Sequence, residues 1–341
     1  MIRNFENGGV DLDNASVLIT GGTGSFGKQM VRTLLKRHRL RRLVVFSRDE
    51  LKQYDMALDF PPSEHPCLRY FIGDVRDGDR LEMALHDVDY VVHAAALKQV
   101  PTAEYNPFEC IHTNVHGAEN VVRAVLRSDV KKVIALSTDK AASPINLYGA
   151  SKLAADKIFI AANHLSGAKR ARYSVVRYGN VFGSRGSVVP LFRRLMAEGA
   201  KSLPVTDARM TRFWITLQQG VDFVLSCLGM MQGGEIFVPK IPSMRTVDLA
   251  KAMAPDLPQR IVGIRPGEKL HEVMITEDDA RTTVDLGDRY VIEPAFAFFP
   301  HGWYLKNGGT AVPEDFRYAS DSNPDWLDAE QMSDLLQATS T

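Results

Sequence analysis

A glycine-rich turn near the N-terminus constrains the fold of this 341-residue chain more than any other feature. Gly21, Gly24 and Gly27 follow the apolar run 17–20 with the spacing G-x-x-G-x-x-G and open the helical pattern 26–37. Glycines permit a tight turn and a close approach of the backbone to a pyrophosphate, and the helix N-terminus supplies free N–H groups. With a strand before it and a helix after it, the turn predicts a dinucleotide site; the alternative is a plain strand–helix turn.

Short apolar runs alternate with amphipathic stretches along the first half of the chain. Runs rich in β-branched residues and bounded by Gly, Asp or Ser are typical of buried parallel strands. The alternation predicts an α/β fold, a doubly wound parallel sheet with helices on both faces. The predicted strands are 17–20, 43–46, 70–73, 90–93, 133–137, 174–178 and 235–238, and the main predicted helices are 26–37, 107–127, with a bend near Gly117, and 147–164.

The chain is expected to divide into three parts. Residues 1–180, completed by about 213–240, form the dinucleotide-binding Rossmann domain. Residues 181–212 and 241–299 are expected to form a smaller substrate-binding lobe over the carboxyl edge of the sheet, where open α/β sheets bind ligands. Residues 300–341 form a tail that packs on the core or on a neighbouring subunit.

Composition argues against several classes of protein. Lys+Arg and Asp+Glu number 41 each, so the net charge gives no reason to expect nucleic acid or an anionic membrane as a partner. The 3 cysteines contain no C-x-x-C pair and the 9 histidines are scattered, so we expect neither a disulfide framework nor a metal site. No signal peptide and no membrane span of ~18 apolar residues is recognisable. A cytoplasmic enzyme is the expectation.

The residues after the second predicted strand bear on the choice of cofactor. An NAD enzyme usually places an acidic residue at this strand tip to bind the ribose 2′-hydroxyl. Here Ser47 and Arg48 occupy the tip and Lys52 follows one helical turn later, and a hydroxyl with two cations suits a 2′-phosphate. We therefore expect NADP. Asp49 keeps NAD possible, and the alternative for the whole segment is a solvated helix start with Asp49 and Glu50 as N-terminal charges.

Two further strand ends offer candidates for cofactor contacts. Asp74, with Val75, follows the third strand, where a carboxylate could accept from the adenine amino group, although a turn or cap role explains it equally well. Ala94 and Ala96 follow the fourth strand, and their small side chains would let the chain pass close beneath the cofactor. Buried alanines also simply pack, so this pattern alone does not decide.

Tyr148 and Lys152 lie four residues apart in a predicted helix and therefore share a face. A free phenol has a pKa of about 10, too high for a base at neutral pH. We expect the Lys152 ammonium and a positive nicotinamide ring to favour the phenolate by lowering the pKa of Tyr148. Such a tyrosine can take a proton from a sugar hydroxyl while a hydride leaves the same carbon.

Asp139 and Lys140 follow the fifth predicted strand, close to the expected position of the nicotinamide. In isolation an adjacent Asp and Lys read as a surface ion pair. Next to the cofactor, burial can make the lysine a neutral base and the aspartic acid a proton donor. An acid beside a base suggests elimination in addition to redox chemistry.

Together these motifs resemble the extended short-chain dehydrogenase/reductase family of nucleotide-sugar epimerases and dehydratases. The resemblance runs from about residue 14 to 336, without departure at the motif positions, and is most specific for the subgroup of 5-inverting UDP-N-acetylglucosamine 4,6-dehydratases. That subgroup acts in pseudaminic acid biosynthesis, for flagellin and surface glycans. The segments that carry the resemblance are 20–27, 47–52, 94–101, 136–140, 148–152, 177–185, 209–214 and 265–272.

The resemblance implies a role for each member of the catalytic group. Tyr148, supported by Lys152, removes the C4 hydroxyl proton as NADP⁺ takes the C4 hydride. Lys140 removes the C5 proton, and Asp139 protonates the departing C6 hydroxyl. Hydride return to C6 and reprotonation of C5 from the opposite face give an inverted product, UDP-2-acetamido-2,6-dideoxy-β-L-arabino-hexos-4-ulose. Related retaining enzymes carry Asp-Glu where this chain has Asp139-Lys140.

The resemblance also implies the binding residues and the assembly. Relatives pair the helices 107–127 and 147–164 across a four-helix bundle, so a homo-oligomer is expected, at least a dimer and up to a hexamer. Substrate contacts are expected from Lys98, Asn180, Thr206, Arg209, Arg212, Arg265 and Glu268. Cofactor contacts are expected from Gly21, Thr23, Gly24, Ser25, Phe26, Gly27, Ser47, Arg48, Asp49, Glu50, Leu51, Lys52, Asp74, Val75, Ala94, Ala96, Lys98, Leu136, Ser137, Tyr148, Lys152, Val181, Phe182, Gly183, Ser184 and Arg185.

Three alternatives remain at this point. A UDP-sugar 4-epimerase would share the cofactor site, Tyr148 and Lys152, but has no use for the pair Asp139-Lys140. A retaining 4,6-dehydratase differs in the stereochemistry at C5. A non-catalytic NADP-binding protein would keep the glycine turn and would have no need of the Y-x-x-x-K pair.

Overall fold

A computed structural model describes residues 3–5, 9–167, 171–296 and 302–338. Its centre is a ten-stranded sheet, counted over these residues, in the order β16-β14-β15-β10-β6-β5-β4-β1-β2-β3. The seven strands from β10 to β3 are parallel, as predicted, and β1 and β2 are buried along almost their entire length. Their bounds are β1 Ser16–Thr20, β2 Arg42–Ser47, β3 Leu68–Ile72, β4 Tyr90–His93, β5 Lys132–Thr138, β6 Arg172–Tyr178 and β10 Ile236–Pro239.

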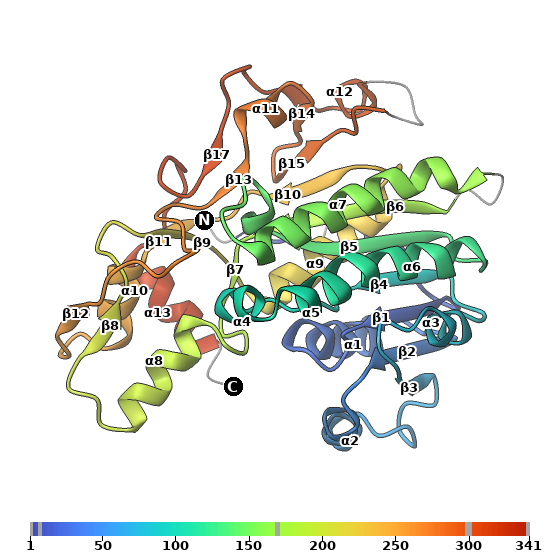
Figure 1. Cartoon of the computed structure of the whole chain (residues 1–341), viewed down its shortest axis with the longest axis horizontal. Coiled ribbons are helices and arrows are strands. Elements are labelled where there is room, and N and C mark those ends of the chain that lie inside the picture. The colour runs from blue at the N-terminus through green and yellow to red at the C-terminus, as the bar shows by residue number, and fades with distance from the viewer. Residues whose placement is uncertain (1–2, 6–8, 168–170, 297–301, 339–341) are drawn as a thin grey trace.

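Helices cover both faces of this sheet, which confirms the doubly wound α/β fold (Figure 1). On one face α1 packs against α9, and on the other α6 packs between α3 and α7. The longer helices carry local start signals: the Asn146 side chain accepts from the Gly149 N–H at the start of α7, and Thr216 and Gln219 form a capping box for α9. The bounds are α1 Ser25–Arg37, α2 Glu50–Asp59, α3 Gly78–Ala84, α6 Gly117–Leu126, α7 Leu147–Leu165 and α9 Leu217–Met230.

The predicted helix 107–127 is interrupted where a bend was expected. It consists of α5 Pro107–Ile111, the π-helical turn η1 His112–His116, and α6, which begins at Gly117. A Cβ on Gly117 would lie 2.9 Å from the Val75 side chain, so glycine lets the helix pack closely against the segment after β3. Within the π turn, Asn114 bonds both the N–H and the carbonyl of Leu97, and it thereby fixes the loop that leads to α4 Val100–Tyr105.

An antiparallel extension of the sheet was not predicted. The strands β15 Arg289–Ile292, β14 Thr283–Asp285 and β16 Thr310–Ala311 continue the sheet beyond β10. Residues 283–292 therefore belong to the main sheet, whereas the sequence had assigned 241–299 to the smaller lobe. Next to this extension, β13 Val273–Ile275 pairs with β17 Tyr318–Ala319. Short helices accompany these strands: α11 Glu277–Ala280 and α12 Trp303–Lys306.

A smaller lobe lies at the carboxyl edge of the parallel strands, at the left of Figure 1. Phe182 and Trp214 pack edge to face in its core, and Met332 of the tail is buried in the same cluster. The described part of the tail thus packs on this lobe through α13 and on the main sheet through β16. The lobe contains β7 Asn180–Val181, α8 Val188–Ala197, β8 Leu203–Val205, β9 Thr211–Ile215, β11 Ser243–Arg245, α10 Thr246–Met253, β12 Gln259–Ile261 and α13 Ala329–Ala338. In the described part of the chain, every helix is too short or too polar to cross a membrane.

Candidate active site

A cavity of about 780 Å³ opens between the carboxyl ends of the parallel strands and the smaller lobe. Its wall brings together most of the predicted cofactor residues from separate parts of the sequence. The predicted residues that line it are Gly21, Thr23, Gly24, Ser25, Phe26, Gly27, Ser47, Arg48, Asp49, Lys52, Asp74, Val75, Ala94, Ala96, Lys98, Leu136, Ser137, Lys140, Tyr148, Lys152, Asn180, Val181, Ser184 and Arg185.

A few predicted cofactor residues lie elsewhere. Phe182 is buried against Trp214 in the core of the lobe, and Leu51 is 68% exposed on the outer side of α2. Glu50 and Gly183 are also absent from the cavity wall. Sequence reasoning missed several lining residues, because most lie next to a predicted residue but carry no distinctive chemistry themselves: Phe46, Gly73, Ala95, Gln99, Thr113, Thr138, Tyr178, Gly179, Gly186, Ser187 and Leu217.

The glycine turn between β1 and α1 forms a cradle that only glycines can build. Gly21 has φ +65°, and a Cβ there would lie 2.9 Å from the Ala95 backbone. A Cβ on Gly27 would lie 2.3 Å from the Gly22 carbonyl oxygen. Gly24 precedes α1 without a side-chain cap, so the first N–H groups of the helix are left for a ligand. The cradle therefore fits the pyrophosphate of a dinucleotide.

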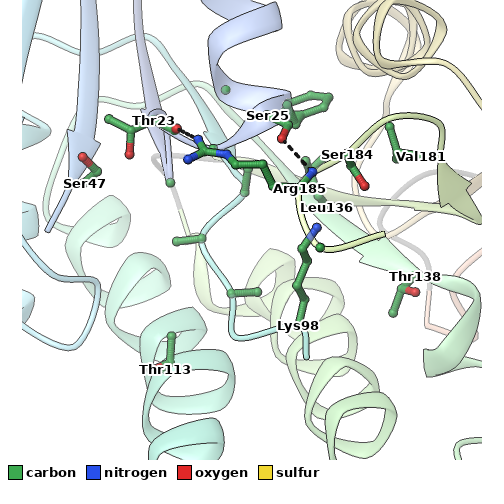
Figure 2. A pocket seen from close by; sticks show the side chains of 18 of the residues that line it. Thr23, Ser25, Ser47, Lys98, Thr113, Leu136, Thr138, Val181, Ser184 and Arg185 are labelled. Carbon is green, nitrogen blue, oxygen red and sulfur yellow. Dashed lines mark hydrogen bonds between the residues drawn. The ribbon is translucent and has the colours of Figure 1, made fainter. Parts of the chain in front are cut away.

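A loop of the smaller lobe closes over this cradle (Figure 2). The Arg185 guanidinium donates to the Thr23 carbonyl at 2.6 Å, and the Arg185 backbone N–H donates to Ser25 Oγ at 3.2 Å. The Lys98 side chain extends into the same space from the loop after β4. The fold thus places two cations beside the glycine turn, where a diphosphate would need them.

The tip of β2 has features of both a 2′-phosphate site and a capped helix start. The Asp49 carboxylate caps α2 by accepting from the Lys52 N–H at 3.0 Å, and it pairs with the Lys52 ammonium at 2.5 Å. The hydrogen bond with the Lys52 side chain lowers the pKa of Asp49. Ser47 and Arg48 line the cavity beside it, and Arg48 lies 3.8 Å from Asp74. The carboxylate at this tip is thus bound to the helix start and to a lysine.

Tyr148 and Lys152 are both buried in the first turns of α7 and line the cavity, as the four-residue spacing predicted. Burial raises the pKa of Tyr148 to about 12, against the opposing effects of the Lys140 ammonium and a hydrogen bond with Thr138. Lys140 is thus the cation with the largest lowering effect on this pKa, whereas Lys152 was the one expected. Burial lowers the pKa of Lys152, and nearby Asp156 opposes the shift.

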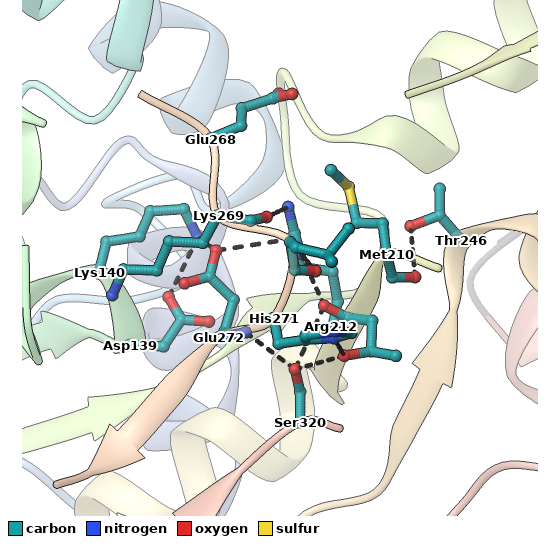
Figure 3. Close-up of polar contacts among 12 residues, drawn as sticks. Asp139, Lys140, Met210, Arg212, Thr246, Glu268, Lys269, His271, Glu272 and Ser320 are labelled. Carbon is teal, nitrogen blue, oxygen red and sulfur yellow. Dashed lines mark hydrogen bonds and ion pairs between the residues drawn. The ribbon is translucent and has the colours of Figure 1, made fainter. Parts of the chain in front are cut away.

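Asp139 and Lys140 form the 3₁₀ turn η2 Asp139–Ala141 directly after β5. Asp139 is fully buried, and its Oδ1 accepts from Thr138 Oγ1 at 2.9 Å and from Lys140 Nζ at 3.1 Å. Glu272, which sequence reasoning did not select, places Oε1 at 3.1 Å from the same Nζ (Figure 3). Lys140 therefore lies between two buried carboxylates and reaches the cavity wall with 24% of its side chain exposed.

The pKa values of Asp139, Lys140 and Glu272 shift in different directions. Burial raises the pKa of Asp139, which agrees with the expectation of a proton donor. Burial alone lowers the pKa of Lys140, but the Asp139 and Glu272 carboxylates raise it overall. The expectation that burial makes Lys140 a neutral base is therefore wrong for this state. Although burial opposes it, the Lys140, Arg212 and Lys269 cations lower the pKa of Glu272.

The predicted substrate residues are less closely gathered than the cofactor residues. Asn180 and Lys98 line the cavity, whereas Thr206, Arg209, Arg212, Arg265 and Glu268 lie outside its wall. The buried Arg212 guanidinium donates to the carbonyls of Thr211, Lys269 and Leu270, so it anchors the segment before β13 instead of facing the cavity. Arg209 is exposed and pairs with Asp207 at 2.9 Å, and Arg265 lies 3.8 Å from Glu268.

A parallel Rossmann sheet, a glycine turn and a Tyr148–Lys152 pair at the sheet's carboxyl edge define an extended short-chain dehydrogenase/reductase. The profile of the polysaccharide biosynthesis protein family matches residues 17–294, and the chain belongs to that family.

Several known proteins are similar to this chain. A Campylobacter jejuni protein named UDP-N-acetylglucosamine 4,6-dehydratase (inverting) is 55% identical over 95% of this chain and 98% of its own length. A Rickettsia typhi protein named UDP-glucose 4-epimerase is 44% identical over 94% of this chain and 95% of its own. Among solved structures, Pen from Bacillus thuringiensis has a TM-score of 0.88 and 34% identity, covering 97% and 99% of the two chains. The dTDP-glucose 4,6-dehydratase DesIV from Streptomyces venezuelae, solved with NAD, shares the fold at a TM-score of 0.67 and 24% identity, covering 74% and 86%.

Proposed function

We propose that this protein is a UDP-N-acetylglucosamine 4,6-dehydratase that inverts C5, a hydro-lyase. The observation that carries the proposal is the acid–base pair Asp139–Lys140: Lys140 lines the cavity wall with Tyr148, and Asp139 is buried behind it, 3.1 Å from the Lys140 ammonium. Epimerisation at C4 needs only a base and a hydride acceptor, whereas loss of water from C5 and C6 also needs an acid and a second base. The 55% identical Campylobacter relative carries the same name.

Tyr148 starts the reaction as the base for the C4 hydroxyl. Its phenol is protonated in the protein without ligands, because burial raises its pKa to about 12. The Lys140 ammonium and the Thr138 hydrogen bond favour the phenolate, and a positively charged nicotinamide would add to them. When bound, a nicotinamide dinucleotide accepts the hydride from C4 and later returns it to C6.

Asp139 and Lys140 carry out the elimination. The new C4 ketone acidifies the C5–H bond, and Lys140 removes that proton. Asp139 holds a proton because of its burial and gives it to the departing C6 hydroxyl, which leaves as water. Reprotonation of C5 from the opposite face gives the inverted product, UDP-2-acetamido-2,6-dideoxy-β-L-arabino-hexos-4-ulose. In each cycle the enzyme takes two protons, from the C4 hydroxyl and from C5, and gives two, to the departing hydroxyl and to C5, so its total number of protons is unchanged.

NADP is the cofactor that we propose for the cradle. The tip of β2 presents the Ser47 hydroxyl and the Arg48 and Lys52 cations toward the cavity, which suits a 2′-phosphate. The only carboxylate there among the described lining residues, Asp49, is bound to the start of α2 and to Lys52. We propose that Asp74, which lines the cavity after β3 and accepts from the Arg76 guanidinium at 2.8 Å, lies at the adenine end.

Substrate binding and cellular setting follow from the same enzyme class. We infer that Lys98 and Asn180 hold the nucleotide sugar from within the cavity, and that Thr206, Arg209, Arg265 and Glu268 contribute from the lobe. The enzyme would work in the cytoplasm as a homo-oligomer, without a metal, as the first step of pseudaminic acid biosynthesis for flagellin or other surface glycans.

One incubation tests the reaction. In deuterated water, the purified protein with UDP-N-acetylglucosamine and a catalytic amount of NADP⁺ should give a product that has lost one water and carries solvent deuterium at C5. Nuclear Overhauser contacts in the product should show inversion at that carbon. An isomer of unchanged mass would instead establish the 4-epimerase, which the Rickettsia relative makes the second candidate.

A further inference from the structure

Glu272 is the one member of the acid–base cluster that comes from a distant part of the chain. It precedes β13, and β13 packs against the turn η2 that carries Asp139 and Lys140. Its backbone is fixed on both sides: the Glu272 N–H donates to Ser320 Oγ at 2.9 Å, and the Ser320 N–H donates to the Glu272 carbonyl at 2.8 Å. Ser320 Oγ bonds in turn to Thr211 Oγ1 at 2.7 Å. The carboxylate is therefore held in place by a rigid frame.

The side chain of Glu272 is placed for Lys140. Glu272 is 1% exposed and Asp139 is fully buried, and each carboxylate lies 3.1 Å from the Lys140 ammonium. One oxygen of each, Glu272 Oε2 and Asp139 Oδ2, has no hydrogen-bond partner among the described residues. The two buried carboxylates repel each other across the ammonium that they share, which favours retention of one proton on the pair.

The surrounding charges decide which carboxyl keeps that proton. Arg212 Nε lies 3.7 Å from Glu272, and the Lys269 ammonium, which donates to the Ala142 carbonyl at 2.6 Å, also lowers the pKa of Glu272. The titratable and charged groups that face the cluster from every side are Asp139 and Lys140 of η2, Tyr148 of α7, Arg212 of β9, and Lys269 and Glu272 of the segment before β13. Arg212 lies beside Glu272, and Arg212 and Lys269 both favour the ionised form of Glu272, so Glu272 is the ionised partner and Asp139 the protonated one.

We propose that Glu272 is a positioning residue for the elimination: as the buried counter-ion of Lys140, it lets Asp139 remain a neutral carboxylic acid that can protonate the departing hydroxyl. This role rests on the proposed dehydration. Without Glu272, Asp139 would be the sole carboxylate beside the ammonium and would ionise. An ionised Asp139 has no proton to give, although Tyr148 could still accept the C4 hydroxyl proton.

As the counter-ion, Glu272 can also take the proton that Lys140 must lose before it serves as a base. Substrate covering the exposed part of Lys140 would exclude water, and charged forms are disfavoured when water is removed. Passage of the ammonium proton from Nζ to Glu272 Oε1, across 3.1 Å, converts the ion pair into a neutral amine and a neutral acid. No proton enters or leaves the cluster in this step, so Asp139 stays protonated while the amine attacks the C5–H bond.

Infrared spectroscopy of Glu272→Gln tests the proposal. The wild type should show the C=O band of a protonated carboxylic acid that disappears in Asp139→Asn. In Glu272→Gln that band should titrate away at lower pH, because the Glu272 carboxylate contributes to the raised pKa of Asp139. Glu277→Gln is the matched control, because Glu277 is exposed on α11 and the substitution makes the same chemical change outside the cluster. Glu272→Asp keeps the charge and should keep the band.

Kinetics of the same variants separate a positioning role from a structural one. Glu272→Gln should lose dehydration roughly 100-fold while the reduced nicotinamide still forms when UDP-N-acetylglucosamine is added. Glu272→Asp should recover part of the dehydration. A Gln variant with the wild-type band, the wild-type titration and the wild-type rate of water loss would overturn the role of Glu272 alone. A wild type that releases no water would overturn the proposed function and, with it, this role.

Discussion

The two ends of the cavity differ in the groups that they present: backbone N–H groups at one end and charged side chains at the other. At the dinucleotide end, the glycine turn and the start of α1 present backbone N–H groups, and positions such as Gly27 have no room for a side chain. At the sugar end, the working groups are buried side-chain charges, Asp139 and Lys140 after β5 and Glu272 before β13. The first end is specified by a continuous stretch of sequence and the second by the packing of distant segments. Binding of the cofactor and choice of the reaction should therefore fail independently.

Tyr148→Phe should have the largest effect, a loss of turnover at the sugar end without a loss of cofactor binding. Removing the phenolic oxygen abolishes the base for the C4 hydroxyl, so turnover should fall by roughly 10²- to 10⁴-fold. The variant should still bind NADP⁺ as the wild type does, because the glycine cradle is untouched, and fluorescence titration with the reduced cofactor checks this. Turnover of the sugar within a few-fold of the wild type would show that Tyr148 is not the base.

Gly27→Ala should damage the other end. The added methyl group would lie 2.3 Å from the Gly22 carbonyl oxygen, so the turn must shift away from its position over the helix N-terminus. Overpacking of this kind costs about 1–3 kcal/mol, which corresponds to roughly 5- to 150-fold weaker cofactor binding. With saturating cofactor, the rate of the sugar chemistry should recover. Gly220→Ala is the control, since a Cβ at that helical glycine meets nothing within 4 Å. Equal cofactor affinities in the two variants would contradict the cradle.

The difference between the two ends also explains what the sequence could predict. The turn 21–27, the strands β1 to β6 and the Tyr148–Lys152 spacing follow local rules, because each is a short pattern with its own geometry. The antiparallel strands β14 and β16 have three and two residues, too few for an alternation of polar and apolar residues to be visible. Glu272 could not be selected because no spacing rule connects it to Lys140. Only the packing of β13 on η2 brings the two together.

Roles of charged residues were predictable next to a local motif and not where the partners come from distant segments. Arg185 was expected at the cofactor, and it does lie on the glycine turn. Arg212 was expected to contact the substrate, but its guanidinium is bonded to backbone carbonyls in the interior. A sequence shows that an arginine has a planar fork of donors but not which acceptors the fold offers it. Likewise the pKa of Lys140 was predicted in the wrong direction, because its second carboxylate was unknown.

The pH dependence of hydride transfer reports on the sugar end without any substitution. Burial raises the pKa of Tyr148 to about 12, so the phenolate is the minor form at neutral pH. Since the phenolate is the base, nicotinamide reduction in a single turnover should rise with pH, by up to about tenfold per pH unit, until the pKa of the complex is reached. Stopped-flow absorbance of the reduced nicotinamide measures it. A rate independent of pH between about 6 and 9 would mean that Tyr148 is already ionised in the complex.

The double variant Arg48→Ala, Lys52→Ala sharpens the account of the dinucleotide end. Both cations line the cavity at the tip of β2, and a 2′-phosphate would lose its charged partners there. NADP⁺ binding should weaken about tenfold or more, while binding of NAD⁺, which has no 2′-phosphate, should change little. The ratio of the two dissociation constants, from calorimetry, is the measurement. If NAD⁺ binds as tightly as NADP⁺ to the wild type, the proposed cofactor preference is wrong.

Arg209→Ala should have the smallest effect, and it asks whether the rim of the smaller lobe belongs to the sugar end at all. Arg209 is exposed and paired with Asp207, so it must leave this pair before it can contact a diphosphate. An exchange of one exposed ion pair for another is worth little, and we expect KM for the nucleotide sugar to rise only about threefold, with kcat unchanged. Arg281→Ala is the matched control, because Arg281 is an exposed arginine paired with Asp278 in the turn after α11. If both variants gave the same KM as the wild type, substrate binding would depend on the cavity wall alone, through Lys98 and Asn180. The lobe would then serve the reaction by excluding water, not by holding the substrate.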